Sequence, residues 1–253
     1  MPINLITWNI QCGHDSGLGE NGWGRRKQAL AHVLEREKPD VLCIQEALPS
    51  QLAFLDGVMA GYDRVGLGRD ANGTEGEHCA IYFERKRIEL VESRTFWLSD
   101  RPDSSDATWD GHLNRICTWA RFADRKHGRT FRVYNTHFPL RASGRVKSAR
   151  LLLDRISEAS EPKILAGDFN CGPRSSVWGS FSAAGLRHAE TAAGRPRPSA
   201  TFRLWKFGVA CLDGIFACPG WNVVGHRVLR EPVGAVYPSD HYGVAVQLAH
   251  AAP

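Results

Sequence analysis

Short runs of apolar residues alternate along the chain with a few longer amphipathic stretches. The short runs are rich in Val, Ile, Leu, Phe and Trp and predict β-strands. The longer stretches repeat apolar residues every three or four positions and predict helices. The predicted strands are 3–9, 41–46, 78–84, 88–98, 115–123, 130–137, 163–168, 211–217, 222–230 and 242–248. The predicted helices are 25–37, 49–58, 143–160 and 174–184. This mixture indicates an α/β protein with stacked sheets and helices outside.

The chain shows no internal repeat, low-complexity tract or linker, so we predict a single domain over residues 1–253. Two segments, Ser99–His112 and Ala192–Ser199, are rich in turn residues and predict loops. Residues Gly17–Gly22 contain a formal G-x-G-x-x-G. A dinucleotide fingerprint needs its first glycine directly after a strand, and Gln11–Ser16 intervene here. We therefore interpret this motif as a glycine-rich loop.

Composition narrows the class of protein. Hydrophobic residues make up 43% of the chain and charged residues 23%, as in ordinary globular proteins. No apolar run approaches the roughly 20 residues that span a bilayer, so we predict no membrane insertion. The net charge of +5 suits an anionic substrate but is too small to establish nucleic-acid binding. The seven cysteines are scattered without C-x-x-C spacing, and no signal segment precedes them, which favours free thiols in the cytoplasm.

Polar side chains stand at the ends of most predicted strands. The positions are Asn9, Gln45-Glu46, Asn135-Thr136-His137, Gly167-Asp168-Phe169-Asn170, Asp213 and Ser239-Asp240-His241. Any one of them alone is typical of a turn residue or a packed histidine. Because polar groups at strand ends of an α/β protein converge on one rim, the whole set predicts a site there.

The residue types at this rim indicate a particular chemistry. Glu46, Asp168 and Asp240 would repel one another unless a cation lay between them. Oxygen ligands suit Mg²⁺, with Mn²⁺ as the alternative. His137 and His241 could exchange protons near neutral pH. Metal, carboxylates and imidazoles together fit attack on a phosphate ester, since the metal neutralises phosphate charge and acidifies water.

In this order, the strand-end set resembles the endonuclease/exonuclease/phosphatase superfamily. That superfamily includes DNase I, exonuclease III, apurinic endonucleases, deadenylases, inositol polyphosphate 5-phosphatases and sphingomyelinases. The resemblance extends from Ile3 to about Val246. It implies a DNase I-like four-layer α/β sandwich, with two central mixed β-sheets flanked by helices. It also implies a metal-dependent phosphoric ester hydrolase.

The resemblance implies roles for the rim carboxylates and amides. Glu46 would be the main metal ligand, with Asn9 and Asp240 close by. Asp168 and Asn170 would orient the attacking water and the phosphate.

The imidazoles and two further residues receive roles in the same way. His241, paired with Asp213, would act as general base or stabilise the transition state, and proton abstraction is assigned to His241 and Asp168 jointly. His137 would bind a phosphate oxygen or serve as the acid. Glu77 is similar to the acidic residue that orients the first histidine, and Arg115 to the phosphate-side arginine. The alternatives for these two are a surface glutamate and a surface arginine.

The segments around residues 95–99, 109–110 and 115–120 resemble a small bacterial subgroup that includes sugar-phosphate phosphatases and is related to deadenylases. Asn114 stands where that subgroup has proline, and we include it with Trp109 as substrate-binding residues. Basic residues cluster at Arg85-Lys86-Arg87, Arg125-Lys126 and Arg141–Arg150, without a long arginine-rich arm.

The predicted partner is thus a phosphorylated small molecule, a sugar phosphate or nucleotide. Two alternatives stay open: a nuclease or deadenylase acting on DNA or RNA, and a catalytically inactive binding module. No sequence feature sets the oligomeric state.

Overall fold

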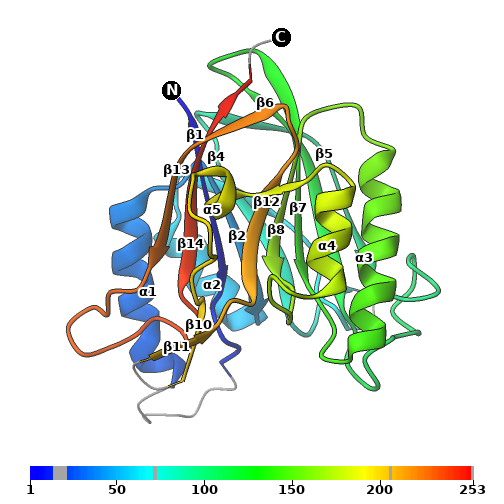
Figure 1. Cartoon of the computed structure of the whole chain (residues 1–253). Helices are drawn as coiled ribbons and strands as arrows, with labels where there is room; N and C mark the ends of the chain where they lie inside the picture. The colour runs from blue at the N-terminus through cyan, green and yellow to red at the C-terminus, as the bar shows by residue number, and fades with distance from the viewer. Residues whose placement is uncertain (14–21, 71–72, 205–206, 252–253) are drawn as a thin grey trace.

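The computed structural model describes residues 1–13, 22–70, 73–204 and 207–251. The predicted glycine-rich loop at Gly17–Gly22 therefore lies, except for Gly22, outside the described residues. Most described residues with regular backbone structure belong to two six-stranded sheets that face each other (Figure 1). Both sheets mix parallel and antiparallel pairs. The predicted fold class is confirmed.

The first sheet contains the N-terminal strand near its centre. Its strands, in spatial order, are β13 (Trp221–Leu229), β14 (Gly243–His250), β1 (Ile3–Asn9), β2 (Val41–Ala47), β4 (His78–Glu84) and β3 (Tyr62–Val65). β1 and β2 are parallel, whereas β1 and β14 are antiparallel. Parallel pairing of β1 and β2 brings their carboxyl ends to the same edge of the sheet.

The second sheet is built around another parallel pair, β7 and β8. Its strands, in spatial order, are β5 (Ile88–Trp97), β6 (Ile116–Asp124), β7 (Arg129–His137), β8 (Lys163–Asp168), β12 (Asp213–Ala217) and β9 (Arg187–His188). A separate hairpin pairs β10 (Phe202–Leu204) with β11 (Phe207–Ala210).

Helices cover the outer faces of the two sheets, which completes four layers (Figure 1). On the first sheet lie α1 (Trp23–Glu37) and α2 (Pro49–Val58), and on the second α3 (Ala142–Ser157) and α4 (Ser176–Ala183). A short helix, α5 (Ala189–Ala192), follows β9. Among the described residues, none of the helices is long and apolar enough to cross a membrane.

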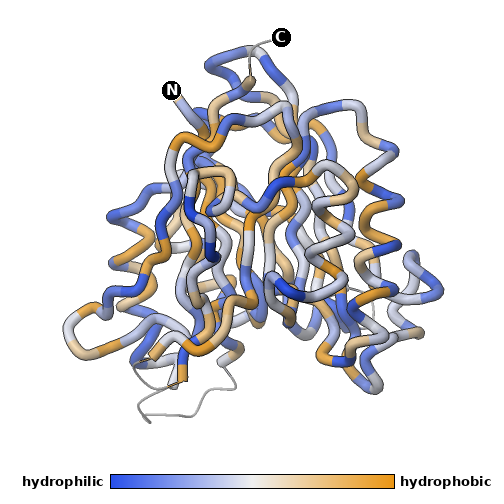
Figure 2. Tube along the Cα trace, in the orientation of Figure 1, coloured by the Kyte–Doolittle hydropathy of each residue, from blue (hydrophilic) through white to orange (hydrophobic). Residues whose placement is uncertain are grey.

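Among the described residues, three large apolar clusters and a small fourth one, of Cys79, Trp97 and Ile116, hold the layers together. The first fills the space between the sheets with small and branched side chains such as Val41, Val133 and Ile215. The second packs the first sheet against α1 and α2, and the third packs the second sheet against α3 and α4. Figure 2 shows apolar residues along the strands and, in alternation with polar ones, along the helices. Burial of this surface, at about 25 cal/mol per Å², is the main driving force for the sandwich.

A polar link crosses the interface between the sheets directly beneath the strand ends. Gln45 of β2 donates from Nε2 to Asn135 Oδ1 of β7 at 2.7 Å and to Thr7 Oγ1 at 2.9 Å. Asn135 donates in turn to the carbonyls of Ile44 and Ala80, both at 2.9 Å. Both amides are fully buried. An unpaired buried amide is costly, so this link fixes the position of one sheet on the other.

The predicted strands and helices correspond to observed elements within a few residues at each end. The helix predicted over 143–160 ends earlier, at Ser157, and the strand predicted over 211–217 begins at Asp213. Several short elements were missed: β3, β9, α5, β10 and β11. Each has two to four residues, too few to display a period.

Candidate active site

The predicted strand-end residues gather at one end of the sandwich, away from the two termini (Figure 1). Asn9 ends β1, His137 ends β7, Asp168 ends β8, and Asp213 begins the antiparallel strand β12. Gly167 allows β8 to enter the site closely paired with β7. Its φ is +150°, and a Cβ there would collide with the carbonyl oxygen of Thr136.

The backbone near the site is strained where side chains must turn towards the rim. Glu46 has a φ of +63° within an irregular pairing of β2 with β4, and Asn170 has a φ of +50°. Gln11, with a φ of +56°, is a third non-glycine residue in this unfavourable region. Such conformations persist only where surrounding contacts impose them, and they are concentrated at functional sites.

Carboxylates form one side of the site. Asn9 Nδ2 donates to Glu46 Oε1 and to Asp168 Oδ2, each at 2.9 Å. The two carboxylates are thus held close together by hydrogen bonds from one amide nitrogen. The backbone N–H of Cys12 donates to Glu46 Oε2 at 2.8 Å. Burial, and then the charge of Glu46, raise the pKa of Asp240. We call this side the acidic wall, consisting of Glu46, Asp168, Asp213 and Asp240.

His241 lies within the acidic wall. Its Nδ1 is 2.8 Å from Asp213 Oδ2 and its Nε2 is 3.8 Å from Asp168 Oδ2. The Ser239 hydroxyl accepts the His241 backbone N–H at 3.1 Å and fixes the residue in place. Burial alone would lower the pKa of His241, but Asp213 and Asp168 outweigh it and raise that pKa to about 10. The ring is therefore cationic at neutral pH.

Asp168 is the central carboxylate of the rim. Its Oδ1 accepts the Asn170 backbone N–H at 2.9 Å, and its Oδ2 is 3.6 Å from His137 Nε2. Burial, and then the charge of Asp213, raise the pKa of Asp168 to about 6. Asn170 reaches back to the Phe138 carbonyl through its Nδ2 at 2.8 Å. Asp168 is thus held rigidly at the point where β7 and β8 end.

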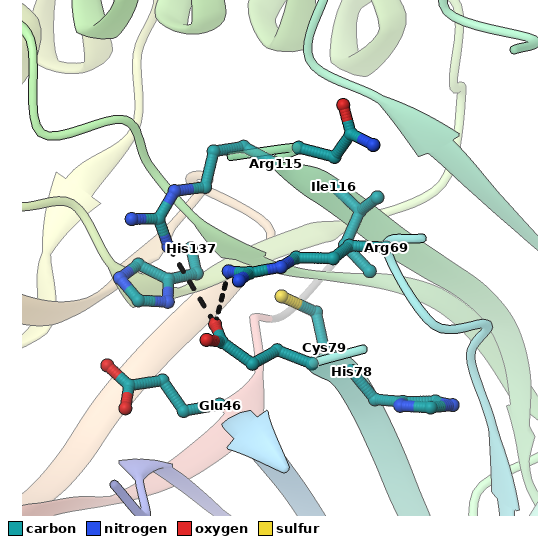
Figure 3. A pocket seen from close by; sticks show the side chains of 9 residues that line it. Glu46, Arg69, His78, Cys79, Arg115, Ile116 and His137 are labelled. Carbon is teal, nitrogen blue, oxygen red and sulfur yellow. Dashed lines mark hydrogen bonds and ion pairs between the residues drawn. The ribbon is translucent and has the colours of Figure 1, made fainter. Parts of the chain in front are cut away.

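Next to the acidic wall, and sharing Glu46 with it, lies a small pocket. Figure 3 shows the Arg69, Arg115 and His137 side chains gathered near Glu46 around this space. Burial, and then the charge of Arg115, lower the pKa of His137 well below its usual range, so this ring is neutral. We call this space the basic pocket, lined by Glu46, Arg69, Glu77, Asn114, Arg115 and His137.

Arg115 is fixed in the basic pocket by a buried carboxylate. Its Nε donates to Asp110 Oδ2 at 3.1 Å. Asp110 also accepts the backbone N–H groups of Leu140 and Arg141 at 2.9 to 3.1 Å. Burial opposes ionisation of Asp110, but these hydrogen bonds and Arg115 lower its pKa overall. The guanidinium is therefore pre-positioned before any ligand arrives.

Glu77 contacts two arginines of the basic pocket. Its Oε2 lies 2.6 Å from Arg69 Nη1 and 4.0 Å from Arg115 Nη1. Its expected role, to orient the first histidine, remains a prediction. Its pKa is raised, chiefly by burial. Arg69 itself was missed, because it follows β3 in an irregular segment where no periodic signal marks it.

The two predicted substrate-binding residues lie in different places. Asn114 lines the basic pocket, next to Arg115. Trp109 lies further out in the loop before β6, where its Nε1 donates to Asp100 at 2.9 Å and Lys147 lies 5.4 Å above its ring. Trp109 is not among the described residues that line the pocket. Its predicted contact with substrate remains a prediction.

The residues at the rim fit a divalent cation. Glu46 and Asp240 are close enough for one charge to raise the pKa of the other, a repulsion that a cation would relieve. The ligand atoms of Asp168, Asp213 and His241 all lie within 4.8 Å of one another. This oxygen-rich set has the chemistry of a Mg²⁺ or Mn²⁺ site, not of a thiolate zinc site. All seven cysteines are free thiols.

Comparison with known proteins identifies the fold and the family. The sequence model of the Endonuclease/Exonuclease/phosphatase family matches residues 6–241. The chain belongs to this family. Members of the endonuclease/exonuclease/phosphatase family are hydrolases that act on phosphate esters. The resemblance inferred from the strand-end residues is confirmed.

Solved structures of this family superpose over nearly the whole chain. A mannosyl-6-phosphatase from Bacteroides thetaiotaomicron is 30% identical, with a TM-score of 0.92 over 98% of this chain and 99% of that one. A second family protein from the same species is also 30% identical, with a TM-score of 0.91 over 98% of this chain and 97% of that one. The human Nocturnin catalytic domain, at 24% identity and a TM-score of 0.79, shares the fold over 99% of this chain and 94% of its own.

Curated relatives are longer than this chain. Nocturnin of Drosophila melanogaster is 27% identical over 199 residues, which is 68% of this chain and 29% of that protein. Protein angel of the same fly is 28% identical over 171 residues, 61% of this chain and 45% of that protein. The aligned part of this chain thus accounts for less than half of either protein.

Proposed function

We propose that the protein is a divalent-metal-dependent phosphoric ester hydrolase acting on a small phosphorylated metabolite. The observation that carries this proposal is the juxtaposition of the acidic wall and the basic pocket across Glu46. One side suits a cation and the other an anion, so a phosphoryl group between them would be bound by both.

Each protein group has a defined task in this proposal. Glu46 and Asp240, with Asn9, would hold Mg²⁺ or Mn²⁺, which supplies charge neutralisation of the phosphate and acidification of a water. Asp168, fixed by Asn9 and Asn170, would orient and deprotonate the attacking water. Cationic His241, paired with Asp213, would offset the negative charge that develops on the phosphoryl oxygens.

The basic pocket would hold the phosphate in place. Arg69 and Arg115 each present a guanidinium there, and neutral His137 offers a hydrogen bond to a phosphoryl oxygen. Asn114 would contact the ester from the same side. Trp109, further out, would form part of the wall around the leaving group.

One comparison favours a small substrate. The similarity to a mannosyl-6-phosphatase, over 98% of this chain, supports a phosphorylated metabolite. The similarity to Nocturnin supports a second candidate, hydrolysis of an ester in a nucleic acid or nucleotide.

The decisive test is a screen of phosphate monoesters, diesters and labelled oligonucleotides with Mg²⁺, Mn²⁺ or excess EDTA. We expect monoester hydrolysis that EDTA abolishes and either metal restores. Full activity in EDTA would overturn metal dependence. Inactivity on every ester would leave the inactive binding module as the better interpretation.

Salt dependence separates a metabolite from a nucleic acid. A nuclease that binds six phosphates should lose about 10³-fold or more in binding between 50 and 200 mM salt. For a small ester we expect kcat/KM to fall less than about tenfold over that range. A steep fall together with degradation of oligonucleotides at low enzyme concentration would favour the nuclease.

A further inference from the structure

An exposed apolar surface lies on the β10–β11 hairpin, beside His241. Among the described residues of this hairpin, three apolar side chains are unusually exposed: Leu204 at 60%, Phe207 at 75% and Val209 at 56%. Soluble proteins expose such side chains singly without consequence, but a cluster beside a catalytic centre indicates a ligand contact.

Strand geometry places part of this cluster on one face. Arg203 and Gly208 are cross-strand partners that face the body of the protein: Arg203 is buried over the Tyr237 ring, and a Cβ at Gly208 would lie against Ala200 and Tyr242. Alternation along a strand turns neighbouring residues the other way. Phe202 and Leu204 are therefore on the opposite face, and Phe207, which pairs with Leu204, joins them. We call Phe202, Leu204 and Phe207 the apolar stripe.

The apolar stripe begins at the catalytic rim. The Phe202 ring packs on the His241 ring with centroids 5.0 Å apart, and the two residues form a β-bridge. At about 3.3 Å per residue, Leu204 and Phe207 lie roughly 7 Å further out than Phe202. That is close to the length of one sugar unit. A group joined to the phosphate through a sugar would reach them.

The stem of the hairpin is anchored to the rim. The Arg203 N–H donates to the Asp240 carbonyl at 2.9 Å, and Thr201 Oγ1 accepts the Asp213 N–H at 3.0 Å. Arg203 Nε also donates to the Ser239 carbonyl at 2.8 Å. These bonds fix where the apolar stripe begins relative to the rim.

We propose that the apolar stripe binds a flat, apolar ring on the leaving group, so that the preferred substrate is a nucleotide-like monoester and not a bare sugar phosphate. This inference rests on the proposed function. A bare sugar has a hydroxyl on most carbons, and covering them with Phe207 and Leu204 removes water without returning hydrogen bonds. A heterocyclic base stacks on an aromatic ring and keeps its polar edge in water.

The test compares two esters that differ only in the base, adenosine 5′-monophosphate and ribose 5-phosphate, with the full chain and Mg²⁺. We expect kcat/KM to favour the nucleotide by about tenfold or more, which is the range of one base–aromatic stack. Phe207→Ser and Leu204→Ser should each reduce that ratio several-fold. Val224→Ser, a change at a 56% exposed valine on β13, should leave the ratio and both rates unchanged.

Several outcomes overturn the proposal. A ratio near one, or an unchanged ratio in Phe207→Ser, removes the stripe from substrate recognition. The proposal is also overturned if Phe207→Ser abolishes only self-association, measured by sedimentation. It is likewise overturned if Phe207→Ser abolishes only binding to phosphatidylcholine vesicles, measured by pelleting.

If neither ester is hydrolysed, the proposed function fails and the stripe is tested separately by calorimetric binding of the same two compounds. Tighter binding of the nucleotide, weakened by Phe207→Ser, would then support the stripe without the activity. Equal binding of both compounds would overturn it.

Discussion

The acidic wall and the basic pocket each bring one buried histidine to Asp168, and the two rings differ in charge. His241 in the wall is 7% exposed and His137 at the pocket is 6% exposed, so burial cannot explain the difference. The neighbours can: carboxylates raise the pKa of His241 to about 10, whereas burial together with Arg115 and other cations lowers that of His137. One residue type thus supplies a cation and a neutral ring a few ångströms apart, both contacting Asp168.

This contrast shows how the site separates two tasks. The acidic wall attracts positive charge and keeps His241 protonated. The basic pocket presents the guanidiniums of Arg69 and Arg115, and burial together with Arg115 keeps His137 neutral and able to donate or accept a hydrogen bond. A phosphoryl group between the two meets a cation on one side and guanidiniums on the other.

The largest effect should come from removing charge from the acidic wall. Glu46→Gln keeps the shape of the side chain but weakens the predicted metal site, so we expect activity to fall at least about 100-fold, with weaker Mg²⁺ binding in calorimetry. Circular dichroism should show a folded protein. Glu89→Gln, at an exposed ion pair with Arg125, is the matched control and should be fully active. Normal turnover of Glu46→Gln would remove Glu46 as the principal ligand.

The two histidines come next. His241→Asn and His137→Asn should each lower kcat by about 10²-fold or more, the usual contribution of an acid–base group. His32→Asn, an exposed histidine of α1, serves as the control. A variant that is folded and retains near-normal kcat would show that its histidine only packs.

The basic pocket is tested through Arg69, which sequence reasoning did not find. Arg69→Gln should raise KM about tenfold or more with a smaller change in kcat, because hydrogen bonds to charged groups are worth about 1.5–3 kcal/mol. Arg94→Gln, at an exposed ion pair with Asp103, should leave both constants unchanged. An unaltered KM in Arg69→Gln would mean that Arg115 and His137 alone hold the phosphate.

The smallest expected effect is on the free energy of unfolding as a function of pH, measured in the presence of EDTA. It is also the sharpest test of the contrast between His241 and His137. The folded-state pKa of His241 is raised to about 10, so its stabilisation is complete below about pH 6.5 and is lost as pH rises towards 10. The pKa of His137 is lowered, so its contribution is present above pH 6.5 and is lost as pH falls.

Urea denaturation across this pH range measures both contributions. His241→Asn should flatten the alkaline side of the profile by on the order of 1–3 kcal/mol. His137→Asn should flatten the acidic side. If both variants changed the same side, the opposite charge states assigned to the two rings would be wrong.

The sequence revealed the acidic wall better than the basic pocket, for a physical reason. Asn9, Glu46 and Asp168 each end an apolar strand, and parallel strands bring such ends together. A reader of the sequence can therefore infer their proximity from the strand pattern alone.

The basic pocket depends on irregular backbone. Arg69 follows a four-residue strand, and Asp110, which holds Arg115, lies in a loop. Positions of this kind are determined by tertiary contacts, and no hydrophobic periodicity in the sequence marks them. The same limit applies to the apolar stripe, whose strands have three and four residues. The contact of Glu77 with Arg69 could not be anticipated for the same reason, since no pattern in the sequence marks Arg69.

The buried amide link between Gln45 and Asn135 has a consequence for redesign of this protein. The link lies beneath the rim and not in a loop, so the two sheets hold the ends of β2 and β7 in a fixed relation to each other. Segment 99–112 and the β10–β11 hairpin also position site residues, through Asp110 to Arg115 and through Arg203 to Asp240. A redesign of the substrate range should therefore keep Asp110 and the stem of the hairpin, and vary only loop residues that make no such contact.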